Sequence, residues 1–408
     1  MTAATLQRRD RHLIYAAALL RGLAAGAISV LAAVYLAKRG FPADEIGLVL
    51  SAGMVGVFAG TAYGTFLADR VGRRRSLVLL ALLAAAGGAA LAWFDSLVSI
   101  TIAAFVGMLS TQGSDRGAAQ ALEVSILPST TSDAERTRVY AWYNALADAG
   151  GAGGALLAAL PAVLRTQLEL PEVPAYDATI LVYAVLLVGV ALLYAQLSPA
   201  TEPAQAAPTG LSAHELPPSA RRSVWRFAGL SAIDSLGGGF IGSALIAYYL
   251  YARFGIGEGP LALLFAAARV MTVLSHFAAA WLARRIGLVN TMVFTHIPSS
   301  LLLLTLPIAP TFPVAAVLFI LREGLTEMDV PTRQSYLMAI VPPHERAWAS
   351  GLTQLARAAG RMIAPAFAGA AMQAGALWLP LAAGATIKIA YDLLLWRAFR
   401  TVRPPEEA

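Results

Sequence analysis

"TFLADRVGRRR", residues 65–75, joins two apolar segments and carries one acidic residue and four arginines. The flanking segments, 44–68 and 76–94, are each about twenty residues long, enough for a helix to cross the hydrocarbon layer of a membrane. Gly72 allows a tight turn between two helices, and the arginines are expected to stay at the anionic cytoplasmic face. The loop therefore predicts two membrane helices connected on the cytoplasmic side.

The composition extends this prediction to the whole chain. Its 408 residues are 58% hydrophobic and 13% charged, with a mean hydropathy of +0.65, whereas soluble domains contain about 25% charged residues. We therefore predict an all-α membrane protein with twelve transmembrane helices. The expected spans are 12–37, 44–68, 76–94, 97–126, 139–161, 178–197, 224–252, 259–283, 288–308, 312–340, 347–373 and 377–398.

The spans are expected to form two pseudo-symmetric bundles of six helices. Segment 198–223 is rich in Pro, Ala and Ser and is typical of a cytoplasmic linker between residues 1–197 and 224–408. The halves also match each other: "LADRVG" at 67–72 resembles "LARRIG" at 282–287, and Asp115 matches Asp329. Internal repeats of this kind predict a binding site at the interface of the two halves.

Lysine and arginine set the expected orientation. They gather at the ends and loops that would be cytoplasmic, and the outer loops hold only Lys38, Arg39, Arg165 and Arg253. This bias predicts a multi-pass protein of the cell's inner membrane with both termini in the cytoplasm. It also accounts for the net charge of +6 without a nucleic-acid partner.

Several kinds of chemistry are disfavoured. The absence of cysteine excludes disulfides, thiol catalysis and Cys-ligated metal. The two lysines, Lys38 and Lys388, do not lie in a Gly-rich phosphate loop, so the chain is not expected to hydrolyse ATP. No nucleophile–base pair or metal-ligand pattern stands out, and we expect neither an enzyme nor a cofactor.

The loop at 65–75 is similar to the signature of the major facilitator superfamily, G-x-L-A-D-R-x-G-R-R-K/R. Asp69, Arg70, Gly72, Arg73 and Arg74 fit it, although Thr stands where the leading Gly is expected. The resemblance implies a monomeric twelve-helix transporter in which Asp69 holds the halves together on the cytoplasmic side in the outward-facing state. The alternative is that these arginines only set the topology.

The stretch "FILREGLTEMDVPTRQ", 319–334, places five charges in an apolar span. Each charge facing lipid at the membrane centre costs roughly 3 kcal/mol, so the span must turn them toward protein or water. We expect Arg322, Glu323 and Glu327 to contact the transport pathway; a structural ion-pair network is the alternative. Helical spacing allows this orientation of the charges, because Glu323 and Glu327 are four residues apart, as are Asp329 and Arg333.

Arg21 and Asp234 occupy equivalent positions in the first and seventh spans. We hypothesise that they form a salt bridge between the halves that opens with substrate or proton. A static bridge, or separate local partners, are the alternatives. Lys388 and Asp392 are expected to pair with each other, outside the site.

Two further faces predict polar contacts. The fifth span carries Asn144 and Asp148, and the eleventh carries Gln354, Arg357 and Arg361 at helical spacing. Both could bind polar or anionic groups, or could only pack against neighbouring helices. In the eighth span Arg269 is a further candidate.

Together these observations predict a secondary active transporter that works by alternating access. Desolvated acids can take up protons near neutral pH, and Asp148, Asp234, Glu323 and Glu327 are the candidates. Our first expectation is proton-coupled export of a small organic molecule. The alternative is proton symport or facilitated uptake of a small organic anion, and a membrane receptor or enzyme is the third class.

Overall fold

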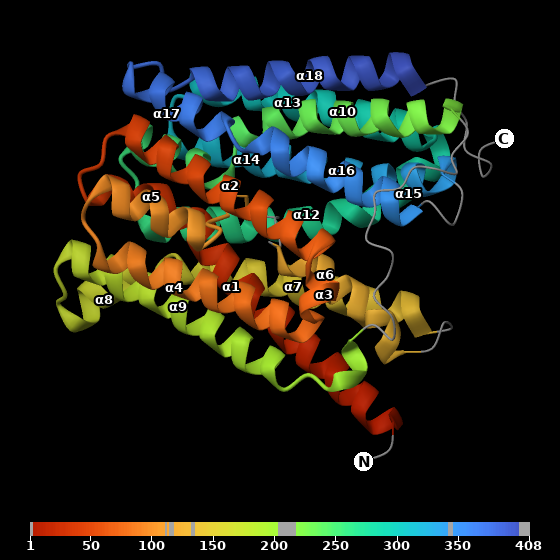
Figure 1. Ribbon diagram of the computed structural model, residues 1–408. Helices are drawn as coiled ribbons and strands as arrows, with labels where there is room; N and C mark the ends of the chain where they lie inside the picture. Colours follow the sequence, from red (N-terminus) through yellow and green to blue (C-terminus); the bar gives the residue numbers. More distant parts are fainter. Residues whose placement is uncertain are drawn as a thin grey trace. The chain divides into compact units, whose positions relative to one another are not determined.

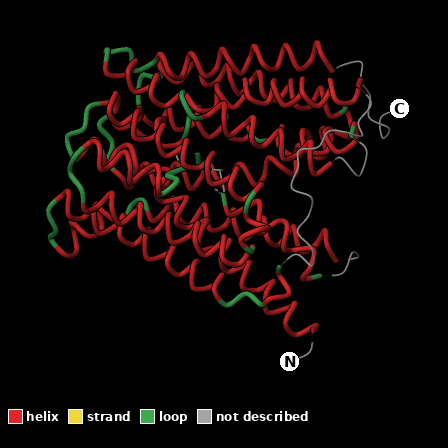
Figure 2. The backbone as a smooth tube through the Cα atoms, in the orientation of Figure 1, coloured by secondary structure: helices red, strands yellow, loops and turns green. Residues whose placement is uncertain are grey.

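The computed structural model describes residues 3–110, 112–113, 118–131, 135–202, 218–341 and 346–399. Every regular element in these ranges is a helix, as Figure 2 shows. Asp115, Arg116 and most of the predicted linker (203–217) lie outside the described residues. The all-helical prediction is confirmed for the part of the chain that the structure describes.

The chain forms two compact units. Unit 1 contains residues 1–210 and 243–266, and unit 2 contains residues 211–242 and 267–408. The division into domains 1–197 and 224–408 stays a prediction.

Unit 1 is built around α1 (Figure 1). Its elements are α1 (Ala3–Lys38), α2 (Ala43–Phe66), α3 (Ala68–Val71), α4 (Arg73–Trp93), α5 (Leu97–Val106), α6 (Ala119–Ile126), η1 (Leu127–Thr130), α7 (Arg136–Leu157), α8 (Leu160–Leu168), α9 (Glu172–Ala195), η3 (Pro199–Thr201) and α11 (Ser243–Phe254), with the start of α12 (Glu258–Ile286). Glu258, at that start, accepts hydrogen bonds from Arg165 of α8 at 2.9 Å and from Tyr176 of α9.

Unit 2 has α10, α13 and α18 side by side (Figure 1). Its elements are α10 (Pro218–Phe240), the remainder of α12, α13 (Leu288–Thr305), η4 (Leu306–Ile308), α14 (Phe312–Thr326), α15 (Asp329–Ile340), α16 (Arg346–Arg361), α17 (Ala364–Gln373) and α18 (Leu379–Phe399).

Several predicted spans are broken into two helices. In the described residues eight helices are long and apolar enough to cross a membrane, and a ninth span results if α7 and α8, bent by 41°, count as one. The predicted spans 97–126 and 347–373 each contain such a break. The first is interrupted after α5, where Met108 adopts φ +49°, and the second is interrupted before Pro365, in the first turn of α17. The count of twelve spans stays a prediction.

Helices α1 and α7 approach each other through glycine. A Cβ atom added at Gly26 would collide with the carbonyl oxygen of Gly151 and come within 3.0 Å of the Ala155 nitrogen. Small residues at such contacts let helix backbones pack closely in a membrane, where the hydrophobic effect does not press helices together.

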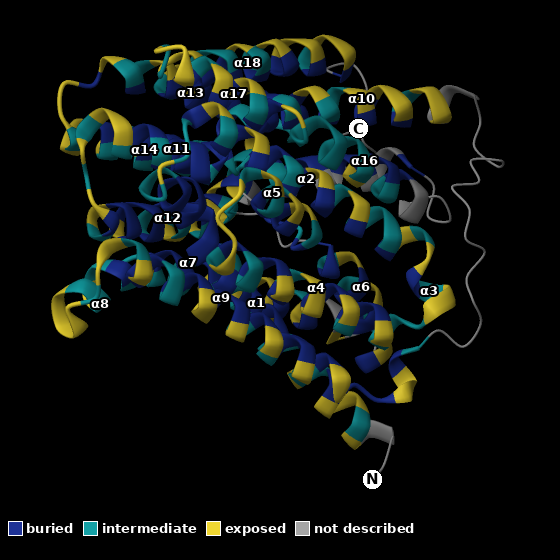
Figure 3. Ribbon diagram, turned by 60° about the vertical axis from the view of Figure 1, so that its left-hand side comes forward, coloured by how far each residue is buried: buried dark blue, intermediate teal, exposed yellow. Residues whose placement is uncertain are grey.

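The buried and exposed sides of the helices differ as expected for a bilayer. In Figure 3, exposed bands along α9 alternate with buried ones. Val185 is 69% exposed, whereas Tyr194 on the same helix is fully buried. Exposed apolar side chains are compatible with lipid, so the buried polar residues become the informative ones.

Candidate functional site

The carboxylate of Asp234, on α10, lies between two cations inside unit 2. Lys388 of α18 donates from Nζ to Oδ1 at 2.7 Å, and Arg357 of α16 donates to Oδ2 at 2.9 Å. Asp234 is only 3% exposed. A carboxylate removed from water this completely remains ionised only when paired and hydrogen-bonded, which these two cations provide.

A histidine extends this arrangement to a second carboxylate. An ammonium group can only donate, so His296 Nε2 must accept from Lys388 Nζ at 3.2 Å. The proton of the neutral ring is then on Nδ1, which donates to Asp392 at 3.0 Å. A hydrogen-bonded path therefore runs from Asp234 through Lys388 and His296 to Asp392.

Arg333 of α15 joins the same region. It pairs with Asp329 one turn earlier and lies 3.6 Å from the Asp234 carboxylate. The spacing of four residues between Asp329 and Arg333 puts both side chains on one face of the helix. We call the following seven residues the Asp234 cluster: Asp234, His296, Asp329, Arg333, Arg357, Lys388 and Asp392. With His296 neutral, its carboxylates and cations balance.

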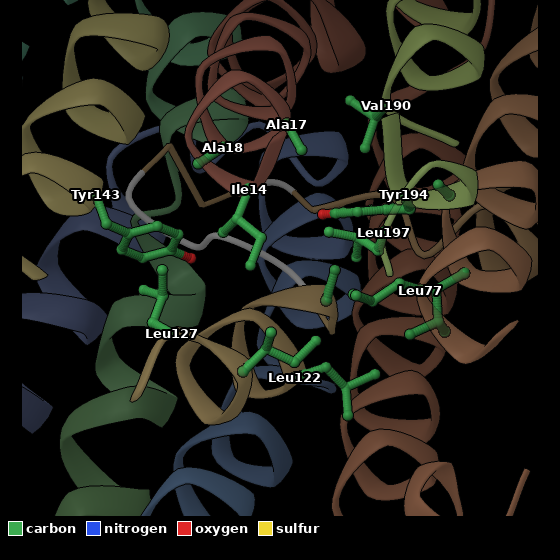
Figure 4. Packing of buried hydrophobic residues seen from close by; sticks show 14 of the residues in the cluster. Ile14, Ala17, Ala18, Leu77, Leu122, Leu127, Tyr143, Val190, Tyr194 and Leu197 are labelled. Carbon is green, nitrogen blue, oxygen red and sulfur yellow. The ribbon is translucent and has the colours of Figure 1, made fainter. Parts of the chain in front are cut away.

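Unit 1 contains a second buried ion pair, between Arg21 of α1 and Glu123 of α6. Tyr194 donates to Glu123 Oε1 at 2.6 Å, and Tyr143 donates to Oε2 at 2.7 Å. Glu123 is fully buried. Figure 4 shows Tyr143 and Tyr194 directing their hydroxyl groups inward from opposite sides of Ile14. We call Arg21, Glu123, Tyr143 and Tyr194 the Glu123 cluster.

The structure gives Arg21 and Asp234 separate partners, each within its own unit. Arg21 pairs with Glu123, and Asp234 pairs with Lys388 and Arg357. This arrangement corresponds to the alternative of separate local partners rather than to the hypothesised bridge between them. The expected direct pairing of Lys388 with Asp392 was wrong, because His296 lies between the two groups.

The other predicted site residues occupy varied places. Arg322 and Glu323 of α14 are both buried and pair with each other, and Arg322 lies 6.0 Å from the ring centroid of Phe319. Glu327 follows the last residue of α14 and is half-buried. Arg269 is half-buried on α12. A role for these side chains in the transport pathway stays a prediction.

The side chains of the two predicted polar faces differ in burial and in their contacts. Arg357 belongs to the Asp234 cluster. Gln354 is exposed and Arg361 half-buried on the same helix, α16, while on α7 Asn144 is exposed and Asp148 half-buried. Of these side chains, the described contacts place Arg357 in the Asp234 cluster.

The loop at 65–75 is held by its own charges and by Glu202. Arg73 Nε donates to Asp69 at 2.7 Å. The backbone N–H groups of Arg73 and Arg74, at the start of α4, donate to the Glu202 carboxylate at 2.6 and 3.1 Å. Helix N-termini favour anions because their N–H groups lack partners within the helix. Arg74 also donates to the carbonyl of Leu197 at 3.1 Å, and Arg70 is exposed.

Gly72→Ala should lower the free energy of unfolding by about 1–3 kcal/mol, because Gly72 adopts φ +107° and a residue with a Cβ is strained there. Thermal unfolding in detergent measures the effect. Gly64→Ala is the matched control: its added Cβ meets Ala118 at an ordinary 3.5 Å. Equal stability of both variants would contradict the argument.

Sequence reasoning missed His296 and left Glu123, Lys388 and Asp392 out of the site. His296 is uncharged at neutral pH when unperturbed and sits in an apolar span, so charge counting does not find it. Glu123 was recognisable as an acid within a span. Its partner Arg21, however, is 102 residues away, beyond the reach of helical spacing.

Comparison with known proteins identifies the family. The model of the Major Facilitator Superfamily matches residues 14–365, most of the chain. The chain belongs to the Major Facilitator Superfamily. The resemblance of the 65–75 loop to the signature of this superfamily is thereby confirmed. As a superfamily member the chain is a multi-pass membrane protein with a transporter fold.

Relatives of known sequence or structure agree with the superfamily assignment. An uncharacterized membrane protein of Saccharomyces cerevisiae, YJR124C, is 25% identical over 417 residues, covering 95% of this chain and 93% of the yeast protein. A bacterial homologue of the human lysosomal transporter Spinster, in an inward-facing unoccupied conformation, has a TM-score of 0.69 at 16% identity, covering 98% of this chain and 96% of its own.

Other superfamily structures are equally similar in fold. The human organic anion transporter MFSD10 has a TM-score of 0.67 at 17% identity, covering 95% of this chain and 99% of its own. A POT family transporter in complex with a thioalcohol-conjugated peptide has a TM-score of 0.76 at 13% identity, covering 96% and 97%. At these identities the similarity establishes the fold and leaves the substrate to be argued from the site.

Proposed function

We propose that this protein is a proton-coupled secondary transporter that works by alternating access and exports a small organic molecule. The observation that carries the proposal is the Asp234 carboxylate, buried in a membrane bundle and held by Lys388 and Arg357. Solved superfamily structures that include a D-xylose–proton symporter support proton coupling by analogy of fold.

The energetics of the cluster favour a role beyond stability. Replacing a buried ion pair by well-packed apolar residues is often neutral or stabilising. A membrane bundle therefore gains little stability by keeping seven titratable or charged side chains together, six of them buried and Arg357 half-buried. The alternative reason for keeping them is functional: they would exchange protons or change partners during a transport cycle.

The coupling step follows from the hydrogen-bonded path. A proton that binds a carboxylate oxygen of Asp234 removes the negative charge that holds Lys388 and Arg357. Lys388 retains its contact with His296 Nε2, and His296 retains its contact with Asp392. Protonation thus converts a balanced cluster into one with excess positive charge. Rearrangement of α16 and α18 would relieve that excess.

The remaining parts of the proposal follow the family plan. Two six-helix bundles rock about a central site, and the protein is a monomer of the inner membrane with cytoplasmic termini. Its partners are protons, a small-molecule substrate and the lipid bilayer. Asp148, Glu323 and Glu327 are the further acidic residues proposed to take part. Proton-linked uptake of an organic anion is the alternative direction and substrate.

Transport by reconstituted protein tests the proposal. Ligands found in a thermal-shift screen would be offered to proteoliposomes under an imposed pH gradient. We expect accumulation against the ligand's own gradient, driven by opposite proton flow, and collapse of that accumulation by a protonophore. Movement in the same direction as protons would establish symport instead. Complete inertness toward all screened ligands would favour a receptor or enzyme.

A further inference from the structure

Unit 1 contains a partly open cavity beside the Glu123 cluster. All its lining residues belong to unit 1: they come from α1, α4 and α9 and from the residues that flank the break between α5 and α6. Small side chains such as Ala24, Ala81 and Ala84 create the space.

The walls of this cavity are mainly apolar. Ile28, Leu80, Leu187 and Val190 line it beside the alanines. Polar atoms come from few residues, among them Arg21, Ser110 and Tyr194. Such a lining stabilises a mostly apolar molecule and offers a small polar region to orient it.

Among the lining residues that the structure describes, the polar region carries no net charge. Arg21 is neutralised by Glu123, and both oxygens of that carboxylate accept hydrogen bonds from tyrosine hydroxyls. An anionic ligand beside Arg21 would also lie near Glu123, and a cationic ligand would lie near Arg21. In surroundings of low dielectric either charge would lack its own counterion, and burying an unpaired charge is strongly unfavourable.

We infer that this cavity binds an uncharged, mainly apolar small molecule that carries one hydroxyl or carbonyl group. Binding itself does not depend on transport; that the bound molecule is the exported substrate rests on the proposed function. The inference separates this protein from a transporter of organic anions, because an anion would require an unpaired cation in the cavity.

Three matched probes test the ligand class. Saturable binding of tritiated 1-naphthalenemethanol to the protein in nanodiscs would be measured with empty nanodiscs as background. Unlabelled 1-naphthoate and 1-naphthylmethylamine would then compete. We expect the alcohol to compete at least tenfold more strongly than the carboxylate or the ammonium ion. Absence of saturable binding, or equal competition by the carboxylate, would overturn the inference.

Two leucine variants on α4 locate the bound molecule. Ala84 lines the cavity, whereas Ala86 is exposed two residues away. Ala84→Leu fills the cavity and should weaken binding of the alcohol at least tenfold, while Ala86→Leu should bind like the unmodified protein. Equal binding by the two variants would place the probe elsewhere and refute the assignment.

A further variant, Glu123→Gln, tests the argument that the cavity disfavours charged ligands. Glu123→Gln leaves Arg21 without its carboxylate and gives the cavity a positive charge, so 1-naphthoate should gain at least tenfold relative to the alcohol. An unchanged ratio of 1-naphthoate binding to alcohol binding would refute the charge argument. If Glu123→Gln does not fold, the Ala84→Leu comparison still tests the inference. A transport assay distinguishes this inference from the proposed function. Binding of the alcohol without its transport would reject only the role of the bound molecule as substrate. Proton-driven transport without binding in the cavity would reject only the ligand inference.

Discussion

Asp234→Asn is expected to lower the free energy of unfolding by about 3–5 kcal/mol and to abolish proton-driven transport. The substitution removes the charge that Lys388 and Arg357 share and leaves both cations buried without it. Removing one partner of a buried ion pair typically costs this much, because the remaining charge stays desolvated. Reversible unfolding in mixed detergent micelles measures the stability, and the proteoliposome assay measures the coupling.

A surface acid provides the control for Asp234→Asn. Asp95 pairs with Arg39, yet its side chain is 93% exposed. Exposed ion pairs contribute about 0–1 kcal/mol, so Asp95→Asn should be nearly neutral.

The double variant Asp234→Asn, Lys388→Met removes the one excess positive charge that Asp234→Asn leaves in the cluster, and it should recover part of the lost stability without restoring coupling. If Asp234→Asn transports with an unchanged pH profile, Asp234 does not couple protons.

Gly26→Ala is expected to lower the free energy of unfolding by about 1–3 kcal/mol. Its Cβ would collide with the carbonyl oxygen of Gly151. Relieving this collision requires α1 and α7 to move apart, which weakens the packing between them. The same detergent unfolding assay applies.

Gly151→Ala on the facing helix is the matched control, because nothing lies within 4 Å of its added Cβ. That control should be neutral or more stable by up to about 1 kcal/mol through its higher helix propensity. A Gly26→Ala protein as stable as the unmodified one would show that α1 and α7 do not pack this closely.

The sequence by itself determined the class of the protein and most of its helices. Apolar runs of about twenty residues are local properties, so α2, α4 and α9 fall close to the predicted spans 44–68, 76–94 and 178–197. The sequence also placed Asp329 and Arg333 on one helix face, because residues four apart lie on the same side of a helix. The family was recognisable from the charged loop at 65–75, where composition and position coincide.

Only the tertiary structure decided which buried charges meet. Asp234 finds Arg357 and Lys388 at separations of 123 and 154 residues, on helices α16 and α18. His296 links Lys388 to Asp392 although nothing in its local sequence marks it. Helical periodicity relates residues within a turn or two, whereas the packing of distant helices depends on side-chain shapes along their whole contact. That packing places the two ion-pair clusters and the cavity, and the proposals made here therefore depend on it.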